Sequence, residues 1–106
     1  MKVLENKNNM FICEDNKFTY LFSYNSPIAK VCNIIGEDYG LYFTINWDYS
    51  QTTLEQLYNF IELHSTQRDN TDNTFAYKLD KESNKKQYLQ KQIDLGNIKM
   101  ITESEF

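Results

Sequence analysis

The chain has 106 residues, enough for one domain that buries roughly two-thirds of the surface exposed when unfolded. Aromatic residues make up 15% of it, whereas Gly occurs three times and Pro once, which argues against a disordered chain or a repeat array. The net charge is −4, with ten acidic and five basic residues in 1–77 and a lysine excess in 78–99, which disfavours non-specific nucleic-acid binding by the whole surface.

Membrane insertion and secretion are both disfavoured. No apolar run approaches the roughly 18 residues that cross a membrane, and residues 1–7 lack the apolar region of a signal peptide. Cys13 and Cys32 have no metal-ligand spacing and fall in apolar runs, which favours two buried free thiols. We therefore expect a cytoplasmic protein with no metal and no cofactor.

The first half of the chain predicts four short strands. Residues 1–9 are polar, and we expect them to be loose or to add a short edge strand. Residues 17–24 alternate strictly, with Phe and Tyr on one face and mainly Thr, Leu and Ser on the other. Short polar turns separate the strands, so an antiparallel meander is the economical arrangement. The expected strands are residues 10–13, 17–24, 28–35 and 41–47.

A helix is predicted after the fourth strand. One apolar helical face is formed by Leu54, Leu57, Tyr58 and Ile61. Two starting points remain open. Thr52 as N-cap forms a capping box with Glu55, whereas Ser50 as N-cap allows Tyr49 and Leu54 to pack as a hydrophobic staple.

The next segment contains a loop, a short strand and a second helix. Residues 65–74 have no apolar side chain and predict a mobile loop. Alternation over residues 75–79 predicts a short strand. The second helix begins after Ser83 or Asn84 and runs to residue 95, with Gly96 suited to the left-handed position that follows a helix.

The last residues complete an α+β fold. Residues 97–101 predict a strand that returns to the sheet, and residues 102–106 are expected to be loose. The predicted architecture is a single domain. It consists of a four-stranded antiparallel meander packed by a helix, followed by a second helix and a short returning strand.

Catalytic signatures are not found in the sequence. It has no Gly-rich phosphate loop, no nucleophile elbow and no His/Cys metal spacing. His64 is expected to be a solvated histidine whose protonated form suits a helix C-terminus. Nothing in the sequence favours a nucleophilic pair between His64 and Cys13 or Cys32. We therefore do not expect an enzyme.

A row of aromatic residues on the second strand has two interpretations. It consists of Phe18, Tyr20, Phe22 and Tyr24. Such a row resembles a platform on which single-stranded bases stack, but that use needs flanking cations, and only Lys17 and Lys30 are near in sequence. We favour a core face covered by the first helix, because this row is the most apolar face that the strands offer.

Four acidic residues are expected to form a rim at one end of the meander. The turns after the first and third strands lie at the same end and carry Glu14, Asp15, Glu37 and Asp38. Clustered carboxylates can imitate nucleic-acid phosphates and engage Arg or Lys of a protein partner. They can also bind a hard cation such as Ca²⁺, and acidic residues are common in exposed turns for no further reason.

Lysines after residue 77 offer an alternative contact to nucleic acid. The candidates are Lys78, Lys81, Lys85 and Lys86. They are interleaved with Asp80, Glu82 and glutamines, so a solvated helix surface is the preferred interpretation.

The corner after the fourth strand carries a recognisable pattern. Residues 47–60 read Trp-Asp-Tyr-Ser-x-Thr-Thr-x-x-x-Leu-x-x-Phe. This pattern resembles the hallmark of small uncharacterised proteins from bacteriophages and mobile elements of AT-rich Gram-positive hosts, as do residues 23–29 and 84–98. The resemblance transfers no chemistry to any residue. It implies a small accessory phage protein, a class that often inhibits host defence systems, anti-CRISPR proteins included.

These observations lead to one expected function and two alternatives. We expect a phage-encoded inhibitor that binds a host nucleic-acid enzyme, such as a CRISPR effector, through the acidic rim. One alternative is a module that binds single-stranded nucleic acid through the aromatic row and the lysines. The other is an oligomeric structural adaptor joined through an exposed sheet edge. A membrane partner is not expected, and the sequence leaves the oligomeric state open.

Overall fold

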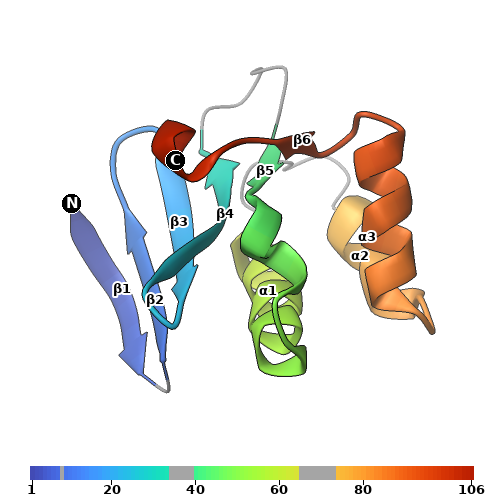
Figure 1. The fold of residues 1–106 in the computed structure, drawn as a ribbon, viewed down its shortest axis with the longest axis horizontal. Helices are drawn as coiled ribbons and strands as arrows, with labels where there is room; N and C mark the ends of the chain where they lie inside the picture. Colours follow the sequence, from blue (N-terminus) through green and yellow to red (C-terminus); the bar gives the residue numbers. More distant parts are fainter. Residues whose placement is uncertain (8, 34–39, 65–73) are drawn as a thin grey trace.

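The computed structural model describes residues 1–7, 9–33, 40–64 and 74–106. They form a six-stranded sheet whose strands follow one another in chain order (Figure 1). Neighbouring strands from β1 to β5 are antiparallel, whereas β6 runs parallel to β5. The strands are β1 (Lys2–Lys7), β2 (Met10–Glu14), β3 (Phe18–Ser23), β4 (Ser26–Cys32), β5 (Leu41–Phe43) and β6 (Lys99–Met100).

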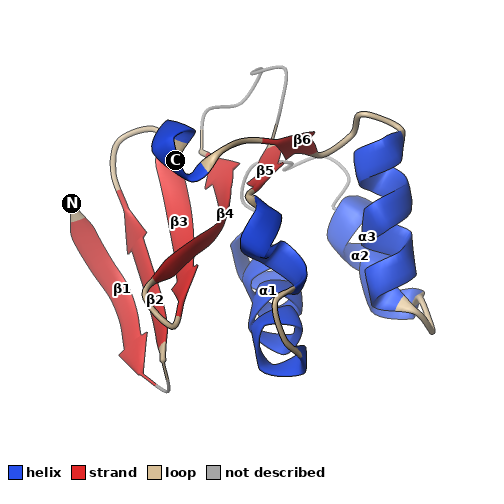
Figure 2. Cartoon of the chain, viewed as in Figure 1, coloured by secondary structure: helices blue, strands red, loops and turns tan. Residues whose placement is uncertain are grey.

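Three α-helices and two short 3₁₀ helices complete the described fold. They are η1 (Ile45–Asp48), α1 (Gln51–His64), α2 (Thr74–Lys81), α3 (Lys85–Asp94) and η3 (Glu103–Glu105). Helix α1 packs against β3 and β4. Helices α2 and α3 lie on the far side of α1 from β1, β2 and β3, while η3 stands apart from them beside β3 (Figure 2). None of the helices in these residues is long and apolar enough to cross a membrane.

This arrangement confirms the α+β class, the meander and the returning strand. Strand β1 adds an antiparallel edge to the four expected strands. Three strands end earlier than predicted, β3 at Ser23, β4 at Cys32 and β5 at Phe43. Residues 34 and 35 of the expected third strand, and residues 65–73 of the expected loop, lie outside the described part of the chain.

The hydrophobic core lies between the sheet and the helices. The face of β3 that lies against α1 is fully buried and consists of Thr19, Leu21 and Ser23. The hydroxyls of Ser23 and Thr53 form a hydrogen bond of 3.1 Å. The second hydroxyl on this face, that of Thr19, donates to Asn33 Oδ1 at 3.0 Å. The core residues include Ile12, Leu21, Ala29, Val31, Leu41, Phe43, Trp47, Leu54, Leu57, Phe60, Ile61, Leu79, Leu89 and Ile98.

The predicted orientation of the aromatic row was therefore wrong. Because side chains alternate along a strand, Phe18, Tyr20 and Phe22 lie on the face opposite α1. The smaller side chains of Thr19 and Ser23 face α1, and their hydroxyls are satisfied by hydrogen bonds. Tyr24 is not in the strand. It lies exposed in the tight β3–β4 turn, with a positive φ of 51° that is followed by one of 65° at Asn25.

Local hydrogen bonds shape the corner between β5 and α1. Trp47 lies in η1 rather than in the predicted strand, and its buried ring stacks on Phe43. Thr44 ends the strand, since its hydroxyl accepts from the Asn46 amide at 3.2 Å and donates to the Pro27 carbonyl at 2.6 Å. Ser50 caps α1 by accepting from the Thr53 amide at 3.1 Å. Tyr49 is 75% exposed, so the hydrophobic staple does not accompany this cap.

The second half of the fold departs from the prediction at α2. A short strand was expected over residues 75–79, but they form part of α2, which places Leu79 in the core. A period-two pattern of three residues is too short to distinguish a strand from one face of a helix. Helix α3 begins after Asn84, whose side chain accepts from the Gln87 amide at 3.1 Å. It ends at Asp94, one residue earlier than predicted, and Gly96 adopts the predicted left-handed conformation with a φ of 82°.

Candidate functional site

The predicted acidic rim is only partly described. Glu14 ends β2 and Asp15 begins the turn to β3, whereas Glu37 and Asp38 lie outside the described residues. The Asp15 carboxylate closes this turn. Its Oδ1 accepts from the amides of Lys17 and Phe18, both at 2.8 Å.

The same carboxylate also accepts a hydrogen bond from Tyr20. The Tyr20 hydroxyl donates to Asp15 Oδ2 at 2.6 Å. This bond, with those from the Phe18 and Lys17 amides, lowers the pKa of Asp15. Burial, helped by the neighbouring Asp15, raises the pKa of Tyr20. Asp15 is therefore an exposed carboxylate that is held in one orientation and in its charged form.

The aromatic row belongs to a larger surface on the sheet face opposite α1, which we call the outer aromatic face. Phe22 packs against Phe11 with ring centroids 5.9 Å apart, and Phe18 packs against Tyr42 at 5.8 Å. The face consists of Phe11, Phe18, Tyr20, Phe22 and Tyr42. Strands β2, β3 and β5 contribute these rings, so the shape of the face depends on the sheet register.

Lys30 lies within the outer aromatic face. It pairs with Tyr20 on β3 and with Tyr42 on β5, and it is only 7% exposed. Its ammonium Nζ lies 4.1 Å from the centroid of the Phe18 ring and 5.5 Å from that of Tyr42. Burial is the main cause of a lowered pKa for Lys30. The cation is thus surrounded by rings and largely removed from water.

Residues 102–106, which we call the strap, cover this face although they were expected to be loose. The Phe106 ring lies 5.4 Å from that of Tyr20 and 5.3 Å from that of Phe22. Lys30 Nζ donates to the main-chain oxygens of Glu105 at 3.4 Å and Phe106 at 3.3 Å. Within the strap, Thr102 and Glu105 form a capping box.

The candidate lysines lie away from the aromatic face. They belong to α2 and α3, which pack on the α1 side of the sheet through Leu79 and Leu89. Lys86 forms a 3.9 Å ion pair with Asp48. The structure therefore does not bring the lysines and the aromatic row together on one surface.

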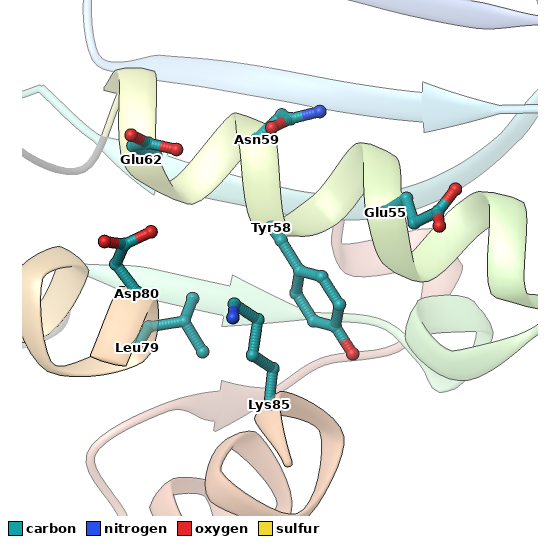
Figure 3. Close-up of a pocket in the computed structure, with 7 residues that line it drawn as sticks. All are labelled: Glu55, Tyr58, Asn59, Glu62, Leu79, Asp80 and Lys85. Carbon is teal, nitrogen blue, oxygen red and sulfur yellow. The ribbon is translucent and has the colours of Figure 1, made fainter. Parts of the chain in front are cut away.

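A groove of about 340 Å³ separates α1 from α2 and the start of α3 (Figure 3). Figure 3 shows the carboxylates of Glu62 and Asp80 at one end of it, with the Lys85 side chain between Tyr58 and Leu79. Burial, and then Glu55, raise the pKa of Tyr58. The groove can accept a basic side chain. Among the described residues, however, no group of three or more His, Cys, Asp or Glu side chains is placed to hold a metal ion.

The two cysteines and the histidine are all at least partly buried. Cys13 and Cys32 are buried thiols that take part in no disulfide, as the sequence predicted. His64 differs from the expectation of a solvated, protonated residue. It is half-buried, its ring centroid lies 5.2 Å from that of Phe60, and burial lowers its pKa although Glu5 and Glu14 act in the opposite direction.

The lowered pKa of His64 predicts a pH-dependent stability. In the unfolded chain the pKa of His64 is about 6.5, and in the folded chain it is lower. Below pH 6.5 the unfolded chain therefore binds a proton more readily than the folded chain. The free energy of unfolding should be full above this pH and should fall as the pH drops through it. Urea denaturation between pH 5 and 8 measures this. A His64→Gln variant should lack this component, and an identical pH dependence in the variant would contradict the prediction.

One comparison with known proteins identifies a family. A model described as a family of unknown function (DUF8033) matches residues 2–76. The chain belongs to this family. The matched region contains β1 to β5, η1 and α1, and it ends within α2. Neither a curated protein nor a solved structure matches the chain.

The sequence analysis missed the roles of Lys30 within the outer aromatic face and of Phe106 in the strap that covers it. Lys30 was treated only as a charge near the aromatic row, but its position between Ala29 and Val31 in an apolar strand is a signal that a cation is buried. Phe106 stands in a polar tail, and an isolated aromatic residue there is the only sequence sign of a contact with the sheet.

Proposed function

We propose that this DUF8033 protein is a small phage-encoded inhibitor that binds a host nucleic-acid enzyme, such as a CRISPR effector, in the host cytoplasm. It acts without catalysis, by placing carboxylates against the basic surface that otherwise holds nucleic acid. Residues 1–77, which include the whole family region, carry ten acidic and five basic residues. The negative electrostatic field of these residues favours association with a basic partner.

The observation that carries this proposal is the state of Asp15. Three hydrogen bonds fix its carboxylate and lower its pKa, yet the residue remains exposed. A charged group that is already fixed loses little conformational freedom when a partner binds it. Glu14 precedes it directly, so two carboxylates lie at this end of the sheet.

The test reverses the charge of the rim while preserving the fold. Asp15 is left unchanged, because its side chain closes the β2–β3 turn, and Glu14, Glu37 and Asp38 are changed to Lys. Inhibition of purified CRISPR effector nucleases is then measured at several salt concentrations. We expect at least a tenfold weaker inhibition and a flatter salt dependence.

The matched control places the same charge change elsewhere. Asp80→Lys, Glu82→Lys and Asp94→Lys alter three exposed residues in α2, in the α2–α3 connection and in α3, away from the β2–β3 turn, and should leave inhibition unchanged. Equal inhibition by the rim variant and the native chain would remove the acidic-contact mechanism. Failure of the native chain to inhibit any effector would remove the proposed target class.

Neither alternative function is favoured by a specific observation. The aromatic row does face away from α1, as base stacking requires, but the strap covers it and the lysines of α2 and α3 lie on the other side. An electrophoretic shift with short single strands tests this use. The exposed edge β1 carries Lys2 and Lys7 at its ends and a register shift between Val3 and Glu5, features that hinder edge-to-edge association.

A further inference from the structure

The outer aromatic face already holds a short peptide segment, the strap. Its Phe106 ring packs against Tyr20 and Phe22, and the main-chain oxygens of Glu105 and Phe106 accept from Lys30. The face thus offers aromatic side chains on which a phenyl ring packs, and a cation that donates to main-chain oxygens. These are the elements by which a protein surface recognises a peptide that carries an aromatic anchor.

The strap also shows an electrostatic preference. Hydrogen bonds from Thr102 are the main cause of the lowered pKa of Glu105, and the positive charges of Lys99 and Lys30 lower it further. The sheet contributes to this through Lys30, whose Nζ lies 3.4 Å from the main-chain oxygen of Glu105 and so places a positive charge beside the acidic residue that precedes the phenyl ring. The preferred segment is one in which Glu or Asp precedes an aromatic residue.

Few contacts hold the strap: the packing of the Phe106 ring, two bonds from Lys30, and a hydrogen bond from Asn46 Nδ2 to Glu103 Oε1 at 3.0 Å. Its only secondary structure is the three-residue η3, and its two bonds to Lys30 are long, at 3.3 and 3.4 Å. Few contacts imply that the strap can leave and return without unfolding the sheet. When another segment replaces the strap, it makes again the contacts that the strap loses, so the exchange has a small net free-energy cost.

The family boundary separates the face from its cover. Lys30 and the five residues of the outer aromatic face lie within the matched residues 2–76, whereas the strap lies outside them. The face is thus built by residues inside the family match and covered by residues outside it. Such a division suits a binding surface whose cover can be exchanged.

We propose that the outer aromatic face is a docking site for an acidic, aromatic-anchored peptide segment of a partner protein. The strap occupies the site in the absence of that partner. The partner's phenyl side chain replaces Phe106 against Tyr20 and Phe22, and its main-chain oxygens accept from Lys30. This site lies on the sheet face and touches the Glu14–Asp15 turn only through the hydrogen bond from Tyr20 to Asp15. Its contacts with the peptide involve neither carboxylate, so it goes beyond the inhibitor function and does not depend on it.

The test uses a labelled peptide with the sequence of residues 102–106, Thr-Glu-Ser-Glu-Phe. Its binding to the native chain and to the full-length Phe106→Ala variant is followed by fluorescence anisotropy. We expect the variant to bind at least tenfold more tightly, because its own strap no longer competes. A peptide with Ala in place of Phe should not bind, and Lys30→Met in the Phe106→Ala background should weaken binding at least fivefold. Leu95→Ala, a change at an exposed residue of the helix side, is the control and should have no effect.

A second measurement covers the case in which Phe106→Ala lowers stability. In the native chain, ring resonances of Tyr20, Phe22 and Phe106 are followed by NMR while excess peptide is added, and all three should shift together. Unchanged resonances, or equal binding of the Ala peptide, would overturn the proposal. Concentration-dependent dimers whose straps are exchanged would also overturn it, because the occupant would then be a second copy of this chain.

Discussion

Replacing Trp47 by Ala should lower the free energy of unfolding by about 3–5 kcal/mol. The Trp47 side chain is 4% exposed, and its ring stacks on that of Phe43 at 5.5 Å. The resulting cavity cannot collapse easily, because hydrogen bonds from Thr44 and Asn46 to Pro27 O hold the backbone around it. Small domains have total stabilities of roughly 5–15 kcal/mol, so the variant should lie close to unfolding at ambient temperature.

Tyr49→Ala is the matched control for this prediction. It removes a neighbouring aromatic residue that is 75% exposed, and its effect should stay within about 0.5 kcal/mol. Urea denaturation followed by far-UV circular dichroism measures both variants, since Trp47 is the only tryptophan and cannot serve as a fluorescent reporter in its own variant. A loss below about 1 kcal/mol for Trp47→Ala would show that the corner is not central to the core.

The sequence pattern at residues 47–60 is explained largely by these structural roles. Trp47 fills the core, Ser50 caps α1 and Thr53 hydrogen-bonds to Ser23. Each role suits the residue type that the pattern specifies. The exceptions are exposed side chains, which contribute little to the fold: Asp48, Tyr49 and Thr52.

Features that depend on near neighbours in sequence were predictable. The turns of the meander, the caps at Ser50 and Asn84 and the left-handed Gly96 each rest on contacts within a few residues. Their physical signals are short polar side chains that bond to local amides and a residue without a Cβ. These signals place the elements, but they do not say which face of a strand is covered by which helix.

The orientation of β3 and the cover of the outer aromatic face required distant contacts. The atoms that accept from Lys30 lie 75 and 76 residues further along the chain. Amphipathic patterning favoured burying the rings under α1, whereas α1 packs on the face of Thr19 and Ser23. The opposite face of the strand, which carries the rings, is covered by the strap. A tail that is polar apart from Phe106 gives little hydrophobic signal for this contact.

Replacing Lys30 by Glu should lower the free energy of unfolding by about 3–5 kcal/mol, which is typical of an uncompensated buried charge. A carboxylate at this position would face the electron-rich surface of Phe18 and the main-chain oxygens of Glu105 and Phe106. All of these groups repel a negative charge. Protonation of the introduced carboxyl would relieve the repulsion, so the deficit should shrink as pH falls toward 5.

Lys30→Met is the matched comparison, because it keeps an unbranched side chain of similar length and removes the charge. Burial lowers the pKa of Lys30, which means that the fold disfavours its charged form, so Met should change stability by no more than about 1.5 kcal/mol. Thermal and urea denaturation at pH 7 measure both variants. Equal stability of the Glu and Met variants would mean that Lys30 does not point into the ring cluster. A large loss with Met would mean instead that the cation itself holds the strap, and the Phe106→Ala variant should then be destabilised to the same extent.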